Sequence, residues 1–398
     1  MTLIHLVSEQ TMQNVLPAMA LLPKRLVFIA SQVSKNSIPN EKNALKLAGI
    51  SAEFIEEILP SDFPSWQETH NAIIKNLPAD SPCVINLTGG TKLMSIGAWS
   101  AATEHKVPAF YCHTRTKSWL SAGTATLPDM SDMASLVNRL SLKILMAAHG
   151  KDESAWKSKP VTEKLQKFGR SAGILHTQYH QQLGAWLAEL RKQVRGEDGK
   201  IPDKGQLKTM LLKPLPRAQS EPVEQLLDAA CAANLIRSDL SGSFFLNATK
   251  RSEVESIANL IEGTWLELVL YNHLLTDPKY ADLHWSVEPA IHQREDYGET
   301  DIVAVDTDKF SLAIFSCKSS LAHVNPLEHL ASLRDRADRL GGKFATACLF
   351  LFQTKNADQA NTIRQYGRQL NVKILLAGEL YPTNEASPAS LSTQPIPP

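Results

Sequence analysis

The sequence lacks an excess of charge of either sign, and it lacks long apolar runs. Its 398 residues hold 41 Lys and Arg against 41 Asp and Glu, so the formal net charge is zero. This argues against a histone-like or wholly basic nucleic-acid-binding protein. No uncharged apolar segment approaches the ~18–20 residues of a membrane-spanning helix, and the first residues do not resemble a signal peptide. The hydrophobic fraction of 43% predicts a folded, soluble protein of two or three domains.

Cysteine is also scarce. There are five cysteines, an odd number, and no two form a C-x-x-C pair: Cys83, Cys112, Cys231, Cys317 and Cys348. This pattern excludes a disulfide framework and a cysteine zinc cage, and it suits a reducing compartment. We therefore expect a cytoplasmic protein.

The balanced total hides an uneven distribution of charge. Residues 1–140 hold 11 basic and 11 acidic side chains, residues 141–250 hold 17 and 11, and residues 251–398 hold 13 and 19. Such segregation predicts separate modules, with ordinary surface variation as the alternative. We place the modules at 1–140, 141–250 and 251–381. A tail rich in Pro, Ser and Thr at 382–398 is expected to be disordered.

The first module alternates between strand and helix patterns. Short apolar runs rich in β-branched residues occupy 3–8, 25–31, 52–58, 82–88 and 108–114, with amphipathic stretches between them. This alternation predicts an α/β domain with a doubly wound parallel sheet. Ligands of such sheets bind beyond the carboxyl ends of the strands, where the strand order reverses. For the order 3-2-1-4-5, that point lies between the first and fourth strands.

Polar residues follow both of those strands. The first strand is followed by Ser8, Gln10, Thr11 and Asn14, and the fourth by Thr88-Gly89-Gly90-Thr91-Lys92. Glycines let a ligand approach the backbone, and the free N–H groups at a helix start favour phosphate. The spacing is neither a P-loop nor a dinucleotide fingerprint. The pattern thus indicates a phosphate-binding loop, with a plain tight turn as the alternative.

These residues carry a resemblance to a known family. Thr88-Gly89-Gly90-Thr91-Lys92, together with Val7-Ser8-x-Gln10 after the first strand, resembles the CARF domains of type III CRISPR accessory proteins. The resemblance covers about residues 1–140. It implies a Rossmann-like sensor that forms a homodimer and binds a cyclic oligoadenylate across the two-fold axis. The implied pocket residues are Ser8, Gln10, Thr11, Asn14, Thr88, Gly89, Gly90, Thr91 and Lys92.

The middle module resembles a winged helix. A helix pattern at 221–233 is followed by two short apolar segments separated by a Ser-Gly-Ser turn. The basic excess of this module is consistent with a nucleic-acid contact. The alternative is a structural connector that transmits motion, which we favour because no aromatic or arginine cluster marks a reading face.

The third module carries the chemistry. A helix pattern spans about 252–275, with a break expected near Gly263 and Thr264. It is followed by a strand around 284–291, a hairpin with strands at 299–305 and 310–318, a helix at 326–340 and a last strand at 345–351.

The hairpin register predicts a cluster of polar side chains. If Val305 pairs with Phe310, Glu299 faces Ser316, on the same side of the sheet as Asp301 and a strand-end lysine. Carboxylates so close repel one another unless a cation lies between them. Mg²⁺ prefers one or two carboxylates with water and phosphate oxygens, and a nearby lysine can stabilise charge that develops on phosphate.

This order of elements resembles the PD-(D/E)xK nuclease fold over about residues 255–380. The match implies Asp301 as a metal ligand for Mg²⁺ or Mn²⁺, Lys318 as the catalytic lysine and Glu267 as a further acid. The family's second acid falls at Ser316, so either the nuclease is weakened or another carboxylate substitutes for it. Glu299 is our candidate for that carboxylate.

Each of these residues has a purely structural alternative. Glu267 completes the pattern Thr264-x-x-Glu267, which is typical of a helix capping box. Asp301 and Lys318 are alternatively ordinary polar residues at strand ends.

Together the two resemblances indicate a CRISPR ancillary endonuclease that cyclic tetra-adenylate activates allosterically. It would cleave DNA and/or RNA, with the metal at Glu267, Glu299 and Asp301 and with Ser316 and Lys318 in the catalytic site. One alternative is a non-enzymatic cyclic-oligoadenylate-sensing winged-helix DNA-binding regulator with an inactive nuclease remnant. Another is a ring nuclease that degrades the cyclic activator.

Overall fold

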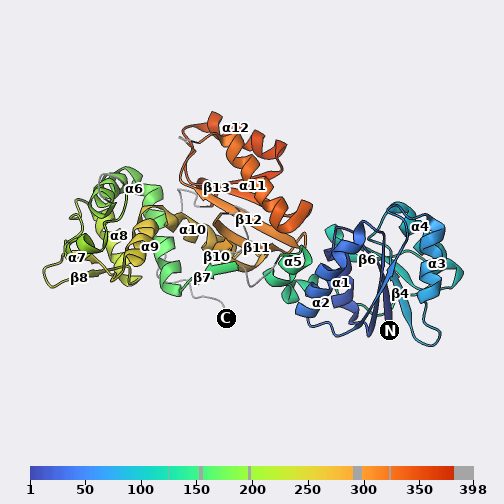
Figure 1. The fold of residues 1–398 in the computed structure, drawn as a ribbon. Helices are drawn as coiled ribbons and strands as arrows, with labels where there is room; N and C mark the ends of the chain where they lie inside the picture. The colour runs from blue at the N-terminus through green and yellow to red at the C-terminus, as the bar shows by residue number, and fades with distance from the viewer. Residues whose placement is uncertain (124, 152–155, 196–198, 290–297, 322–323, 381–398) are drawn as a thin grey trace. The chain divides into compact units, whose positions relative to one another are not determined.

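The computed structural model describes the chain except for residues 124, 152–155, 196–198, 290–297, 322–323 and 381–398 (Figure 1). The tail expected at 382–398 therefore lies outside the described residues. Contacts divide the chain into two compact units. The first comprises Met1–Lys157, Pro278–Ile314 and Arg334–Ala347, and the second comprises Ser158–Asp277, Phe315–Leu333 and Cys348–Pro398.

The first module contains a six-stranded sheet in the order β3-β2-β1-β4-β5-β6. Neighbouring strands are parallel except for β6, which pairs antiparallel with β5. The expected parallel sheet is thus confirmed, and the strand order reverses between β1 and β4. The strands are β1 (Thr2–Leu6), β2 (Arg25–Ala30), β3 (Glu53–Ile58), β4 (Cys83–Asn86), β5 (Ala109–His113) and β6 (Ser118–Ser121).

Helices bury this sheet, as the continuous apolar sequence of β1 and β2 requires. They are α1 (Met12–Leu21), η1 (Ser34–Ser37), α2 (Ile38–Leu47), α3 (Trp66–Asn76) and α4 (Lys92–Glu104). A capping box of Ser65 and Glu68 begins α3. Gly97 brings α4 close to α3, because a Cβ at this position would lie 2.2 Å from the carbonyl oxygen of Trp66.

The chain between the two sheets is mainly helical. It contains η3 (Met133–Arg139), α5 (Leu142–Ala148), α6 (Glu163–Arg195), α7 (Lys204–Leu211) and α8 (Glu221–Ala232), whereas η2 (Thr114–Thr116) connects β5 and β6 of the first sheet. The antiparallel hairpin of β8 (Ile236–Ser238) and β9 (Phe244–Leu246) follows α8, so the expected helix and hairpin are present. The backbone of α6 is kinked at Tyr179.

A second six-stranded sheet has the order β14-β13-β12-β11-β10-β7. Its edge strand β7 (Trp156–Lys159) was not expected, because its sequence is polar and its residues are largely exposed. The other strands are β10 (Tyr280–Pro289), β11 (Thr300–Asp306), β12 (Ser311–Lys318), β13 (Thr346–Leu351) and β14 (Val372–Leu376). The helices of this part are α11 (Pro326–Gly341), η6 (Gly342–Phe344), α12 (Ala357–Gln369) and α13 (Ala377–Leu380).

The long helix expected at 252–275 is interrupted, as the sequence predicted. It comprises α9 (Arg251–Asn259), a π-helical turn η5 (Leu260–Thr264) and α10 (Trp265–Leu274). Glu262 in the π turn pairs with Arg191 and Arg195 of α6, each at 3.2 Å. No helix among the described residues is long and apolar enough to span a membrane.

The turn between β11 and β12 differs from the expected one. Phe310 has a φ of 51° and lies in the turn, so the expected strand pair of Val305 and Phe310 is not formed. The cause is Asp306, whose carboxylate accepts two backbone N–H groups of the turn, at 3.1 and 3.2 Å. The predicted pairing of Glu299 with Ser316 was counted from a Val305–Phe310 pair. Because that pair is not formed, the predicted register no longer follows.

Candidate functional site

The loop after β4 packs tightly against the end of β1. A Cβ at Gly89 would lie 2.0 Å from the carbonyl oxygen of Leu6, and Gly90 has a left-handed φ of 71°. Both positions therefore require glycine, the first for close approach and the second for its backbone conformation. The constraint on Gly89 comes from the neighbouring strand and is structural, and the predicted phosphate contact of the loop stays a prediction.

The residues around the two glycines are held by hydrogen bonds. The Thr88 hydroxyl donates to Asn86 Oδ1 at 2.6 Å and accepts the Cys112 N–H at 2.7 Å, which ties the loop to β4 and β5. Thr91 is the N-cap of α4 and accepts the Met94 N–H at 3.2 Å. The first turn of α4 therefore starts at the loop, with the exposed Lys92 beside it.

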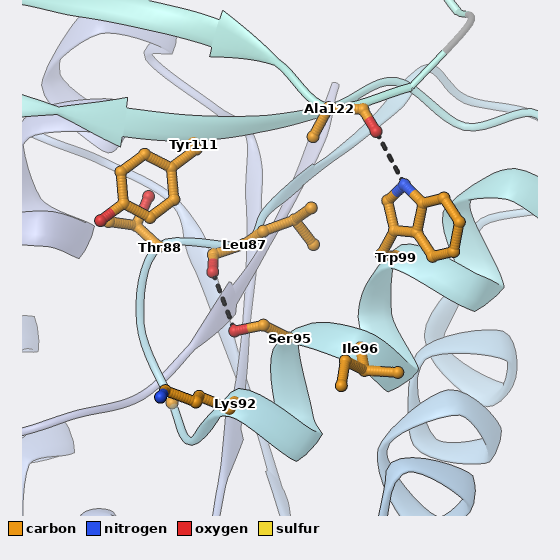
Figure 2. A pocket seen from close by; sticks show the side chains of 9 residues that line it. Leu87, Thr88, Lys92, Ser95, Ile96, Trp99, Tyr111 and Ala122 are labelled. Atoms are coloured by element: carbon orange, nitrogen blue, oxygen red, sulfur yellow. Dashed lines mark hydrogen bonds between the residues drawn. The ribbon is translucent and has the colours of Figure 1, made fainter.

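A cavity of about 540 Å³ lies beside this loop (Figure 2). Its walls come from the loop, α4, β5 and the end of β6, and Trp99 closes one side by donating to the Ala122 carbonyl at 2.8 Å. Most of these wall residues were not predicted from the sequence, although Ser95, Ile96 and Trp99 follow Lys92 at helical spacing. The lining residues are Leu87, Thr88, Gly90, Lys92, Ser95, Ile96, Trp99, Tyr111 and Ala122.

The residues after β1 divide into two groups. Ser8 and Gln10 are half-buried, and the Ser8 hydroxyl accepts the Gln10 N–H at 3.2 Å. Thr11 is buried and donates to the Ala148 carbonyl at 2.8 Å. Asn14 is fully buried and bonds to the Leu6 carbonyl at 3.1 Å. Thr11 and Asn14 therefore act in packing here, and their predicted contact with a ligand stays a prediction.

A buried polar network connects the segment after β1 to the loop after β4. The Asn14 amide donates to the Glu41 carboxyl at 3.1 Å, and Asn86 Nδ2 donates to Asn14 Oδ1 at 3.1 Å. Burial raises the pKa of Glu41 well above its ordinary value, against the opposing effect of Asn14. Asn86 also donates to His5 Nδ1 at 3.2 Å. Burial lowers the pKa of His5 to about 3, so the imidazole is neutral at physiological pH.

His5 predicts a loss of stability in acid, whereas Glu41, whose raised pKa favours its protonated form, contributes in the opposite sense. An unfolded histidine takes up a proton near pH 6.5, whereas folded His5 resists protonation down to about pH 3. The stability that His5 contributes is complete above pH 6.5 and falls by up to about 1.4 kcal/mol per pH unit below it. Urea unfolding at pH 7, 6 and 5 should show a shallower pH dependence for His5→Gln than for the wild type. The exposed control His105→Gln should keep the wild-type slope, and an unchanged slope in His5→Gln would contradict the prediction.

The acids of the second sheet differ in their surroundings. Asp306 is fully buried and also accepts the Thr346 hydroxyl at 2.7 Å, so it is structural. Asp301 is half-buried between the buried Thr300 and Ile302. The pairing of Trp285 with Ile302 and of Val287 with Thr300 places Ser286 opposite Asp301.

Glu299 is exposed and immediately precedes β11. The Ser286 hydroxyl donates to the Glu299 carboxylate. Ser286 thus donates to Glu299 and lies opposite Asp301 in the strand pairing, which brings the three residues to one end of β11. Ser286 was not predicted from the sequence, since only the register of β10 against β11 places it opposite Asp301.

The remaining predicted residues lie in the second compact unit. Ser316 is buried and Lys318 half-buried at the end of β12, where the Lys318 carbonyl accepts the Phe352 N–H at 3.0 Å. The Phe352 ring lies 5.0 Å from that of Trp265, edge to face. Trp265 precedes half-buried Glu267 by two residues on α10, so these contacts connect the segments that carry Lys318 and Glu267.

A stacked histidine completes this aromatic cluster. His176 of α6 stacks on Trp265 with ring centroids 4.1 Å apart, and burial lowers the pKa of His176 to about 4. The capping-box alternative for Glu267 is not formed. Thr264 makes no side-chain cap bond. Its backbone is helical, because the π turn continues directly into α10.

The donor types at β11 fit a hard cation. Among the described residues, no group of three or more His, Cys, Asp or Glu side chains comes together to hold a metal ion. Glu267 belongs to the other compact unit than Glu299 and Asp301, and the metal site expected at these three acids stays a prediction. Mg²⁺ needs only one or two carboxylates, since it keeps several waters. Glu299 and Asp301 satisfy that requirement in donor type and number.

The helix α8, which precedes the β8–β9 hairpin of the winged-helix-like part, is acidic on its exposed side and so does not suit contact with DNA. The exposed side of α8 carries Glu221, Glu224 and Asp228, at helical spacing, beside Gln225. Acidic side chains repel the phosphate backbone, whose contacts dominate nucleic-acid affinity. This observation favours the connector interpretation of the middle module.

Comparison with known proteins now decides the nature of the first module. Residues 2–143 match the family model of the Card1 CARF domain. The N-terminal module is a CARF domain. The parallel sheet and the loop at its point of reversal agree with this match, which covers the first module as predicted. No curated protein matches the sequence.

Three solved structures share the fold of the CARF-containing chain. Protein VC1899 from Vibrio cholerae aligns with a TM-score of 0.70 and 17% identity, covering 95% of this chain and 94% of that one. Can2 from Sulfobacillus thermosulfidooxidans, in complex with cyclic tetra-adenylate, aligns with a TM-score of 0.64 and 17% identity, covering 94% of each chain. A type III CRISPR defence DNA nuclease activated by cyclic oligoadenylate aligns with a TM-score of 0.52 and 14% identity, covering 90% of this chain and 46% of that one.

Proposed function

We propose that the protein is a metal-dependent endonuclease of type III CRISPR antiviral defence, activated by cyclic tetra-adenylate. The observation that carries the proposal is the CARF domain with its Gly89–Gly90 loop and cavity at the point where the strand order reverses. The whole-chain likeness to Can2, which was solved with cyclic tetra-adenylate, supports the choice of ligand. The proposal assigns cleavage of DNA and/or RNA to the second sheet.

The loop chemistry suits a nucleotide phosphate. The first turn of α4 offers N–H groups and the positive end of the helix dipole, and Lys92 adds a full charge. Thr88 and Ser95 supply hydroxyls at the cavity, and Ile96, Trp99 and Tyr111 supply apolar wall. Ser8 and Gln10 would approach from the end of β1, which adjoins the loop.

A two-fold dimer would complete the ligand site. Leu93, Ile96 and Trp99 lie along one side of α4 and are 48%, 51% and 50% exposed, next to the cavity. A contiguous apolar stripe beside a binding site is typical of an interaction surface. Because a cyclic tetranucleotide is itself symmetric, two copies of the chain would each supply one loop.

The dimer proposal predicts the behaviour of Leu93→Glu. Each dimer would lose two buried leucines and gain two buried charges, so its dissociation constant should rise by at least about 100-fold. Light scattering after gel filtration should show a monomer, and binding of cyclic tetra-adenylate should fall with it. Leu212→Glu is the matched control, since Leu212 is 66% exposed on the other compact unit. A dimer that persists in Leu93→Glu would contradict this surface.

The cleavage proposal assigns roles on the second sheet. Asp301 and Glu299 would hold Mg²⁺ or Mn²⁺, which when bound would supply Lewis-acid activation of the phosphodiester and of a water. The Ser286 hydroxyl orients the Glu299 carboxylate. Lys318 would stabilise negative charge on the phosphate, on the strand that the sheet order places next to β11. Glu267 would act from α10, and Ser316 would contribute a hydroxyl where the family has an acid.

One experiment separates this proposal from its alternatives. The protein is incubated with labelled single-stranded DNA, RNA and plasmid, with and without cyclic tetra-adenylate and Mn²⁺. Cleavage that requires both additions supports the proposal. Duplex binding without cleavage would indicate the regulator, although the acidic face of α8 counts against it. Loss of the ring with intact nucleic acid would indicate a ring nuclease.

A further inference from the structure

The start of β11 is held from α11 as well as from β10. Arg336 Nη1 donates to the Glu299 carbonyl oxygen at 2.8 Å. Gly298 has a left-handed φ of 60°, and a Cβ built on it would lie 3.3 Å from Arg336 Nη2. The guanidinium therefore lies directly against the backbone of residues 298 and 299. This backbone carries the carboxylate to which Ser286 donates.

Arg336 differs from the other arginines of its helix. Arg334 pairs with Asp338 at 2.6 Å, and Arg339 pairs with Asp335 at 2.8 Å, both at i,i+4 spacing. Within the described part of the chain, Arg336 makes no ion pair, and its one hydrogen bond is to the Glu299 carbonyl. Among the described residues, no carboxylate therefore neutralises its charge, and its one hydrogen bond to them leaves most of its five N–H donors unused there.

This position suits the recognition of an anion. A guanidinium binds phosphate oxygens through two parallel N–H bonds, with more geometric specificity than an ammonium group. The neighbouring acids, Glu299 and Asp301, would repel a phosphate in the absence of a cation, so an adjacent fixed positive charge offsets that repulsion. The bond to the Glu299 carbonyl limits where the guanidinium can point, which reduces the entropy lost on binding.

We propose that Arg336 binds a backbone phosphate of the nucleic-acid substrate at the start of β11, beside the Glu299–Asp301 pair. This inference rests on the proposed endonuclease activity and adds a substrate-binding residue to it. The class of ligand is a phosphodiester chain, since the contact reads charge and shape rather than bases. The contact is made in the ground state and in the transition state, so it contributes mainly to KM.

The test uses Arg336→Gln and Arg336→Lys in the full chain. Glutamine keeps an N–H donor for the Glu299 carbonyl but loses the charge, whereas lysine keeps the charge without the fork. Arg336→Gln should lower kcat/KM for activated cleavage by about 10- to 100-fold, mostly through KM. Arg336→Lys should recover part of the loss. Arg339→Gln, on the same helix and 54% exposed at its side chain, should retain the wild-type value.

A binding measurement separates a substrate contact from a structural role. Fluorescence anisotropy with a short labelled DNA or RNA is performed on the Asp301→Ala background, with cyclic tetra-adenylate present. Arg336→Gln should weaken binding and reduce the slope of log K against log salt by about 0.7–0.9, the value for one phosphate contact. The proposal is wrong if the affinity and salt slope of Arg336→Gln match those of Arg339→Gln, or if Arg336→Gln retains the full cleavage rate. Arg336 would then only support the backbone of Glu299. If the wild type binds but never cleaves, the proposed endonuclease activity fails, while a reduced slope would still establish the phosphate contact.

Discussion

Asp301→Ala is expected to lower activator-dependent cleavage at least about 10³-fold, because a lost metal ligand removes several kcal/mol of charge stabilisation from the transition state. Asp301 is half-buried near the start of β11, opposite Ser286, whose hydroxyl donates to Glu299. The measurement is the initial rate of cleavage of labelled DNA and RNA with cyclic tetra-adenylate and Mn²⁺. Binding of the activator should not change, because the CARF domain is built on the other sheet.

The controls for Asp301→Ala distinguish chemistry from folding. Asp335→Ala removes an exposed acid that pairs with Arg339, and it should cleave at the wild-type rate. Asp306→Ala removes the fully buried acid that closes the hairpin turn, so it should lower the melting temperature. Asp301→Ala should melt close to the wild type. Wild-type cleavage by Asp301→Ala would show that this strand does not hold the metal.

Gly89→Ala is expected to weaken binding of cyclic tetra-adenylate by at least about 100-fold. A Cβ at this position meets a backbone carbonyl oxygen at 2.0 Å, and backbone cannot rotate aside as a flexible side chain can. Relieving such an overlap displaces the loop by an amount that a well-packed region resists, at a cost of roughly 1–3 kcal/mol or more. Thr88 and Lys92 would move with it. Isothermal titration of the full chain with the cyclic nucleotide measures the effect.

A second glycine of the same module is the matched control. A Cβ at Gly123, which follows the cavity-lining Ala122, would meet nothing within 4 Å. Gly123→Ala should therefore bind the ligand as the wild type does. Gly89→Ala should also lose activator-dependent cleavage, whereas cleavage without activator should not change. Equal affinities of the two variants would mean that the loop after β4 does not contact the ligand.

Patterns of periodicity and glycine position predicted the first module well. The strand–helix alternation, the reversal between β1 and β4 and the glycine-containing turn before α4 all follow from residues near one another in sequence. The break at Gly263 and Thr264 was also visible, because glycine interrupts a helical pattern. In these cases the local sequence and the tertiary structure favour the same conformation.

The features that escaped prediction depend on contacts distant in sequence. Ser286 and Arg336 converge on Glu299 from β10 and α11, and no local pattern marks either residue. Phe310 looked like a strand residue because it is apolar, yet the Asp306 carboxylate extends the turn to include it. The polar strand β7 was missed because an exposed edge strand has no apolar face to reveal it.

The π turn between α9 and α10 sets which way the second helix faces. A π turn accommodates one residue more than a regular helical turn, and each residue of an α-helix rotates the following side chains by about 100°. Because of that extra residue, Trp265 meets the rings of His176 and Phe352, and Glu267 is oriented with it. A chain one residue shorter between 260 and 264 would keep the composition of α10 but turn this side of the helix about a quarter of a circle away. The spacing of residues here is thus as much a determinant of the site as their identity.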